Sequence, residues 1–245
     1  MPNNFSIQVL TAMDHHVSLW LCVLMNKIIT ALKAQKKNPN RVNVYLDGEF
    51  TFGLTRIVAA WLSVGQELDD EQIARLEQQD SEEVALESAV KYISYRSRTG
   101  LEIRRRLSEK GFSDQEIDKV LQRLRTNGLV ADEQYARSWV ESRSASHPRS
   151  RRLMAMELRQ KGVSDLDIEK ALEKTEDDDK LAYQAASRYA RRLANLEWDK
   201  FRERLSAFLL RRGFAYGTIA PLVRRVWSEI QAAENPEQNY NKERG

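Results

Sequence analysis

An internal repeat of 51 residues is the feature of this sequence that most constrains how the chain can fold. Each copy holds a leucine, a basic residue, a glycine and an isoleucine at the same offsets. These residues are Leu107, Lys110, Gly111 and Ile117 in the first copy, Leu158, Lys161, Gly162 and Ile168 in the second, and Leu209, Arg212, Gly213 and Ile219 in the third. The order is typical of a helix that ends in a left-handed glycine and is followed by a second helix. A basic residue before each glycine suits the partial negative charge of a helix C-terminus.

A further helix is expected before each of these pairs, at roughly residues 81–97, 132–146 and 177–194. Thr99 with Glu102 and Ser113 with Glu116 have the spacing of capping boxes, which start helices. One such unit buries little apolar surface alone and gains stability by stacking on its neighbours. The sequence therefore predicts a mainly α-helical, elongated tandem array of three three-helix repeats, over residues 81–131, 132–176 and 177–233.

The region before the repeats has a different pattern. Val42, Val44 and Leu46 alternate with polar residues, and the Asp47-Gly48 pair that follows is typical of a tight hairpin turn. We expect a β-hairpin or three-stranded sheet and a short helix within residues 25–64. Residues 66–83 hold eight acidic residues against one arginine, which favours a solvated acidic linker and helix over residues 65–80. A helix should start near Asp69 and Asp70.

The two ends of the chain offer no folded element. Residues 17–24 are apolar but too short to cross a bilayer, and no basic residue precedes them as in a signal peptide. We expect residues 1–24 to be an extension without a folded role, and both Met1 and Met25 remain candidate starts. Residues 234–245 form a polar tail. These features predict a cytoplasmic protein with no membrane segment.

Few residues of this chain suit catalysis or metal binding. Cys22 is the only cysteine, which excludes a disulfide framework. Asp14, His15 and His16 cluster near the start, but their spacing is not that of a zinc site. The sequence has no phosphate-binding glycine loop, and the acidic run at 176–180 fits a helix N-terminus. We therefore expect no catalytic residue, no metal, no cofactor and no small-molecule substrate.

Comparison of the three copies separates scaffold positions from candidate binding positions. A residue type found in all copies is most simply structural, whereas Arg104, Arg105 and Arg106 have no basic counterpart in the other two copies. At helical spacing Arg105 faces away from the apolar Ile103 and Leu107. A solvated helix face and a specific contact surface both fit this pattern. The candidate partner-binding or DNA-binding residues are Arg98, Arg104, Arg105, Arg106, Arg149, Arg151, Arg152, Arg191, Arg192 and Arg211.

Several segments, taken in order, resemble the RecX family of bacterial recombination regulators. They are the block from Arg98 to Gly111, the link "NGLVADEQYA" and the stretch "SRSASHPRSRRLMAMELRQKGV". The resemblance covers about residues 81–230, with weaker support from the hairpin region. Residues 1–24 and the polar tail have no place in the family pattern.

The resemblance implies a function without catalysis. RecX-like proteins bind the RecA recombinase filament on single-stranded DNA and modulate it, mostly as inhibitors of filament growth, ATP hydrolysis and strand exchange. It carries over no site residue, and the basic helices of this chain could meet the filament or its DNA. We expect the protein to be a monomer. The alternative is a free-standing DNA-binding protein in which the helical modules contact phosphates directly, because clustered basic helices suit both roles.

Overall fold

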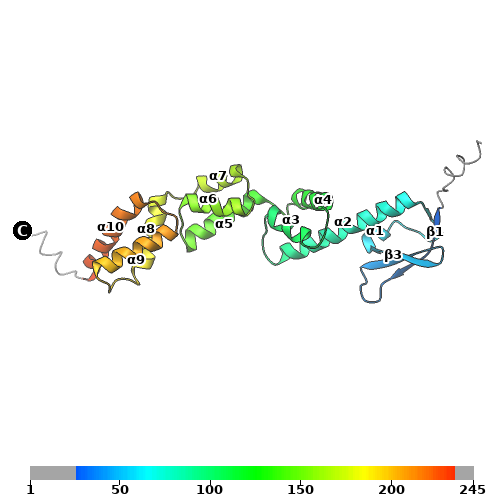
Figure 1. Cartoon of the computed structure of the whole chain (residues 1–245), viewed down its shortest axis with the longest axis horizontal. Helices are drawn as coiled ribbons and strands as arrows, with labels where there is room; N and C mark the ends of the chain where they lie inside the picture. The colour runs from blue at the N-terminus through cyan, green and yellow to red at the C-terminus, as the bar shows by residue number, and fades with distance from the viewer. Residues whose placement is uncertain (1–25, 235–245) are drawn as a thin grey trace, which may run out of the picture. The chain divides into compact units, whose positions relative to one another are not determined.

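The computed structural model describes residues 26–234, which fall into two compact units divided between Ser88 and Ala89. The predicted extension over residues 1–24, including Asp14, His15, His16 and Cys22, and all but the first residue of the predicted tail lie outside the described residues. The protein is mainly α-helical, as the repeat predicts, with a small sheet at the start of the described chain (Figure 1). None of the described helices is long and apolar enough to cross a membrane.

The first unit is built on a four-stranded antiparallel sheet. Its strands are β1 (Lys27–Ala34), β2 (Arg41–Leu46), β3 (Glu49–Thr55) and β4 (Glu67–Leu68), in the order β3-β2-β1-β4. Asp47 and Gly48, with φ of 51° and 91°, make the tight turn between β2 and β3. Strands β1, β2 and β3 form the three-stranded sheet that the sequence offered, and β4, which lies beyond the expected range, adds a fourth strand by pairing with Lys27 and Ile28 of β1. A strand of two residues is too short to show an alternating pattern.

Helix α1 (Arg56–Ala59) lies between β3 and β4, and helix α2 (Asp70–Ser94) follows β4. Helix α2 begins at Asp70, as expected, but it is continuous to Ser94, which corrects the expectation of a separate helix starting near residue 81. It begins where the Asp69 carboxylate accepts from the Gln72 backbone N–H at 2.6 Å. Asp80 belongs to the acidic block but is buried, accepting from Arg41 at 2.9 Å and from the Thr55 backbone N–H. The acidic block is therefore partly structural.

The second unit holds three helical modules. Module 1 consists of α2 from Ala89 onward, α3 (Gly100–Ser108) and α4 (Asp114–Thr126). Module 2 consists of α5 (Asp132–Ser146), α6 (Arg151–Gln160) and α7 (Asp165–Glu173), and module 3 of α8 (Asp178–Ala190), α9 (Trp198–Arg211) and α10 (Tyr216–Glu234). In module 2, α7 packs on both α5 and α6, and in module 3 all three helices contact one another (Figure 1). The core of modules 2 and 3 is one continuous cluster of apolar side chains.

The middle helix of each module ends in the same way. Gly111, Gly162 and Gly213 have φ of 87°, 79° and 85°, a left-handed conformation that an L side chain adopts only with strain. The residue after each glycine donates its backbone N–H to a leucine carbonyl five residues earlier, the bond that defines a Schellman helix end. The three bonds run from Phe112 to Leu107 at 3.3 Å, from Val163 to Leu158 at 3.1 Å and from Phe214 to Leu209 at 3.2 Å.

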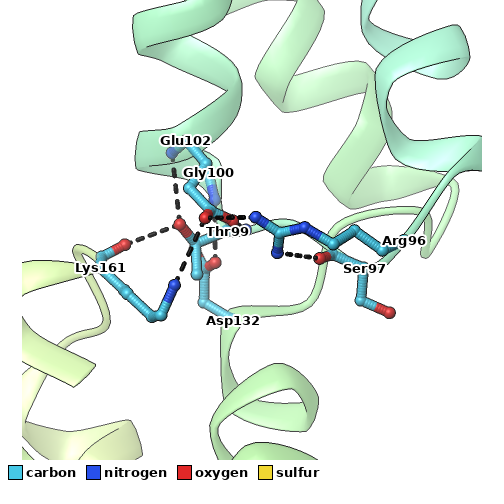
Figure 2. Close-up of polar contacts among 7 residues, drawn as sticks. All are labelled: Arg96, Ser97, Thr99, Gly100, Glu102, Asp132 and Lys161. Carbon is cyan, nitrogen blue, oxygen red and sulfur yellow. Dashed lines mark hydrogen bonds and ion pairs between the residues drawn. The ribbon is translucent and has the colours of Figure 1, made fainter. Parts of the chain in front are cut away.

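The starts of the first two middle helices, α3 and α6, also join their modules to the next. Thr99 caps α3 together with Glu102, and its hydroxyl donates to the Lys161 carbonyl of module 2 at 2.6 Å (Figure 2). Beside it, the Gly100 N–H donates to the Asp132 carboxylate at 2.9 Å. The structure therefore fixes this junction by backbone groups at helix ends rather than by side-chain packing alone.

The same arrangement recurs between modules 2 and 3, one repeat later. Ser150 caps α6, and its backbone N–H donates to the Arg212 carbonyl at 3.0 Å. The Arg151 N–H donates to the Asp178 carboxylate at 2.8 Å, as Gly100 does to Asp132. Pro148, two residues earlier, does not start this helix, because the cap residue is Ser150.

The two junctions require glycine for a second reason. A Cβ added at Gly162 would lie 2.5 Å from Leu101 Cβ, and one at Gly213 would lie 2.7 Å from Leu153 Cβ. At Gly111 nothing lies within 4 Å. Gly111 is therefore required only by its backbone conformation, whereas Gly162 and Gly213 are required by conformation and by the neighbouring module.

This difference predicts unequal effects of the same substitution. Gly111→Ala should destabilise the helical unit by about 1–2 kcal/mol, the cost of a left-handed alanine. Gly162→Ala should cost about 2–5 kcal/mol, because overpacking of a well-packed contact adds to the backbone strain. Urea unfolding of the two variants measures both values, and equal losses would contradict the close approach of Leu101 to Gly162.

Candidate partner-binding surface

The ten candidate arginines divide into those that bind within the protein and those that do not. Arg104 of α3 contacts two carboxylates of α4, forming an ion pair with Asp118 and another with Asp114 at 3.5 Å. Arg106 pairs with Glu109 at 3.2 Å. These pairs lie at the surface, where each contributes roughly 0–1 kcal/mol. Two of the three consecutive arginines are thus already held by acidic neighbours.

Arg98 and Arg149 occupy equivalent positions, one repeat apart, and Lys200 occupies the third. The Arg98 guanidinium lies 4.1 Å from the centre of the Tyr92 ring, and Arg149 forms an ion pair with Glu157. Each guanidinium keeps a buried Nε without a hydrogen-bond partner in residues 26–234. Because a basic residue recurs in all three copies, the repeat comparison places this position with the scaffold.

Arg151 also has a structural role. Its backbone N–H contributes to the junction with Asp178, and its guanidinium donates to the Leu172 carbonyl at 3.0 Å. Leu172 lies in the last turn of α7, and its carbonyl also accepts from the Thr175 backbone N–H at 3.0 Å. Arg151 therefore closes the end of α7 as well as starting α6.

Five candidates remain exposed, and the described part of the chain offers their side chains no ion pair or hydrogen bond. They are Arg105, Arg152, Arg191, Arg192 and Arg211. Arg105, Arg152 and Arg211 lie on α3, α6 and α9, the middle helices of the three modules, and the other two follow the end of α8. On α3, Arg105 is exposed while Ile103 and Leu107 are fully buried. We call these five residues the unpaired arginine set.

The structure shows an acidic centre at the first junction that the sequence analysis did not include among its candidate residues. The Glu102 carboxylate lies between Lys161 at 3.4 Å and Arg96 at 3.1 Å, and it also accepts from the Thr99 N–H at 3.2 Å (Figure 2). Burial alone would raise the pKa of Glu102, but these three partners outweigh it, and the pKa lies below its ordinary value. The Lys161 charge is therefore neutralised within the protein.

The described residues form no metal centre. Within residues 26–234, no group of three or more histidine, cysteine, aspartate or glutamate side chains converges as a metal ion requires. The polar groups found here are helix caps, ion pairs and arginines. Of these, the exposed arginines suit binding of an anion.

Four models of one protein family match consecutive parts of this chain. The model described as the regulatory protein RecX N-terminal domain matches residues 27–69, which span the sheet. The first, second and third three-helix domains of RecX match residues 85–124, 132–172 and 176–223. The three matched ranges correspond to modules 1, 2 and 3.

Curated relatives support the same assignment. The regulatory protein RecX of Leuconostoc mesenteroides is 32% identical over 211 residues, which cover 83% of this chain and 77% of that protein. The regulatory protein RecX of Clostridium perfringens strain 13 is 32% identical over 204 residues, covering 81% of this chain and 95% of the relative.

Solved structures share the architecture. A crystal structure of regulatory protein RecX superposes with a TM-score of 0.65 at 29% identity, covering 78% of this chain and 96% of that one. The crystal structure of RecX from Lactobacillus salivarius, at 24% identity and a TM-score of 0.52, shares the fold over 60% of this chain. With the sheet domain and all three helical domains matched in order, this chain belongs to the RecX family of regulatory proteins.

Proposed function

We propose that this protein binds the filament that the RecA recombinase forms on single-stranded DNA and inhibits its growth, ATP hydrolysis and strand exchange. It acts as a monomer in the cytoplasm and uses no catalytic chemistry of its own. The unpaired arginine set makes the contact, either with acidic groups of the recombinase or with the DNA that the recombinase holds. The partner itself is taken from the family resemblance.

The unpaired arginine set is the observation that supports this proposal most strongly. An arginine that packs or pairs inside a protein has a structural reason to be present, whereas five exposed arginines without partners do not. Arg105, Arg152 and Arg211 also stand where the other copies of the repeat have no arginine. Charge at such positions favours encounter with an anionic surface and contributes to its recognition.

Inhibition of DNA-dependent ATP hydrolysis by the cognate recombinase tests the proposal. The wild-type protein should inhibit at well below one molecule per recombinase protomer. A variant with Arg105→Ala, Arg152→Ala and Arg211→Ala should require about tenfold more protein, a loss of ~1.4 kcal/mol in binding. Its free energy of unfolding should change by no more than about 0.5 kcal/mol per site, because the three side chains are exposed.

Arg137→Ala is the matched control. Arg137 is also exposed, but it pairs with Glu133 on its own helix at 2.8 Å and is outside the unpaired arginine set. This control should inhibit like the wild type. Inhibition that is unchanged in the triple variant, or lost equally in the control, would show that the unpaired arginines do not make the contact.

Salt dependence of DNA binding separates the proposal from a free-standing DNA-binding role. If all five unpaired arginines contacted single-stranded DNA directly, the logarithm of the affinity would fall against that of salt with a slope of about −3.5. We expect weak binding to DNA without the recombinase and a shallower slope. Tight binding with the steep slope, together with inhibition only when the protein coats the DNA, would favour the DNA-binding role.

A further inference from the structure

A second arginine-rich site lies where module 3 meets module 2. It is a pocket of about 290 Å³ between the end of α5, the outer face of α8 and the end of α9. Three guanidinium groups line it, from Arg188, Arg192 and Arg212, together with the rings of Tyr189 and Phe208. No carboxylate is among its lining residues. The pocket is thus positively charged and partly apolar.

Comparison with the first junction shows why this charge is unusual. Arg212 is the repeat counterpart of Lys161, whose ammonium is neutralised by Glu102. The counterpart of Glu102 one repeat later is Leu153, which cannot neutralise a cation. The basic residue at this position is therefore neutralised by a glutamate at the first junction, but it has no acidic counterpart at the second.

The surroundings of Arg212 increase the imbalance. Its pKa is lowered by burial and by the nearby charges of Arg149 and Arg143. Glu157 lies in the same region but pairs with Arg149. The Nη1 of Arg212 is buried and has no hydrogen-bond partner within the described residues. A buried donor of a charged group that finds no acceptor in the protein is costly, and this cost adds to the unbalanced positive charge around Arg212.

The guanidinium groups are also held in place. The Arg212 guanidinium carbon lies 5.0 Å from the centre of the Phe208 ring. The Phe208 ring in turn stacks on the Tyr189 ring, with 4.1 Å between the ring centres and 12° between the ring planes. Arg188 donates to the Ala145 carbonyl at 2.7 Å, so its position is fixed by the end of α5. Arg192 is exposed and unpaired at the rim. Two anchored guanidinium groups and one adjustable one have the arrangement of a preformed anion site.

We propose that this pocket binds a phosphate group, supplied either by free phosphate or by the backbone of a nucleic-acid strand. Guanidinium groups present paired N–H donors that match phosphate oxygens, and a pocket of this size has room for a phosphate with an ester substituent. The proposal concerns the protein alone and does not depend on binding of the recombinase. It assigns Arg212 a role in binding phosphate, in addition to its structural role at the end of α9.

The proposal is tested by titrating the full chain with inorganic phosphate and following the arginine Nε–H resonances by NMR. Chloride at matched ionic strength serves as the reference. Phosphate should shift the Arg212 and Arg188 resonances in a saturable way that chloride does not reproduce. Arg212→Gln should weaken phosphate binding at least tenfold. Arg192→Gln, at the exposed rim, tests the same site without altering a buried side chain and should also weaken it.

Arg204→Gln is the control with the same change in net charge. Arg204 is exposed on α9, has no ion pair within the described part of the chain, and does not line the pocket. Its phosphate affinity should stay within twofold of the wild type. Equal shifts in chloride, or equal weakening in this control, would show unspecific screening and overturn the proposal.

A second titration identifies the source of the phosphate. A short oligothymidylate that shifts the same resonances at lower concentration than inorganic phosphate would identify a nucleic-acid strand as the ligand. Saturation by inorganic phosphate alone would identify free phosphate. An acidic peptide that shifts these resonances where neither phosphate source does would contradict the proposal and assign the pocket to a protein carboxylate.

Discussion

The left-handed glycines at the ends of α6 and α9 are the constraint on which the helical array depends. At Gly162 and Gly213 the absence of a side chain lets the first turn of the preceding module's middle helix approach the helix end. There the capping residues Thr99 and Ser150 bond to carbonyl groups that the ending helix leaves without partners. Each of these glycines thus ends a helix and lets that helix end join the preceding module. Gly111 needs only the first of these properties.

Because the scaffold is repeated, differences between its copies carry the functional information. The basic residue before the glycine meets Glu102 at one junction, while at the other it lies near Arg143 and Arg149. The middle helices likewise share their buried leucines and differ in exposed arginines. The repeated geometry therefore presents charges that vary from module to module, which is what the proposed contact with an anionic partner would use.

The repeat period was enough to predict the three-helix modules and their order, because it depends on glycine ends and buried positions spaced along one chain. It could not predict β4 or the continuous α2. A strand of two residues has no pattern of its own, and Asp80 is bound by Arg41, a residue 39 positions away. The sequence identified the ten candidate arginines as a group, but it did not show which of them are paired within the protein and which are not. The partners of Arg104 lie on the next helix, and that of Arg151 is a backbone carbonyl, so neither is visible in local spacing.

Amide hydrogen exchange at the first residues of the helices tests the central claim, that the repeated junctions hold the modules together. N–H groups in the first turn of a helix have no partner within the helix and exchange quickly. Gly100 and Arg151 donate across a junction to Asp132 and Asp178. Asp114 and Asp165 occupy the same helical position, but their N–H groups have no acceptor among residues 26–234. The account predicts strong protection at Gly100 and Arg151 and little at Asp114 and Asp165. Equally fast exchange at all four would contradict it.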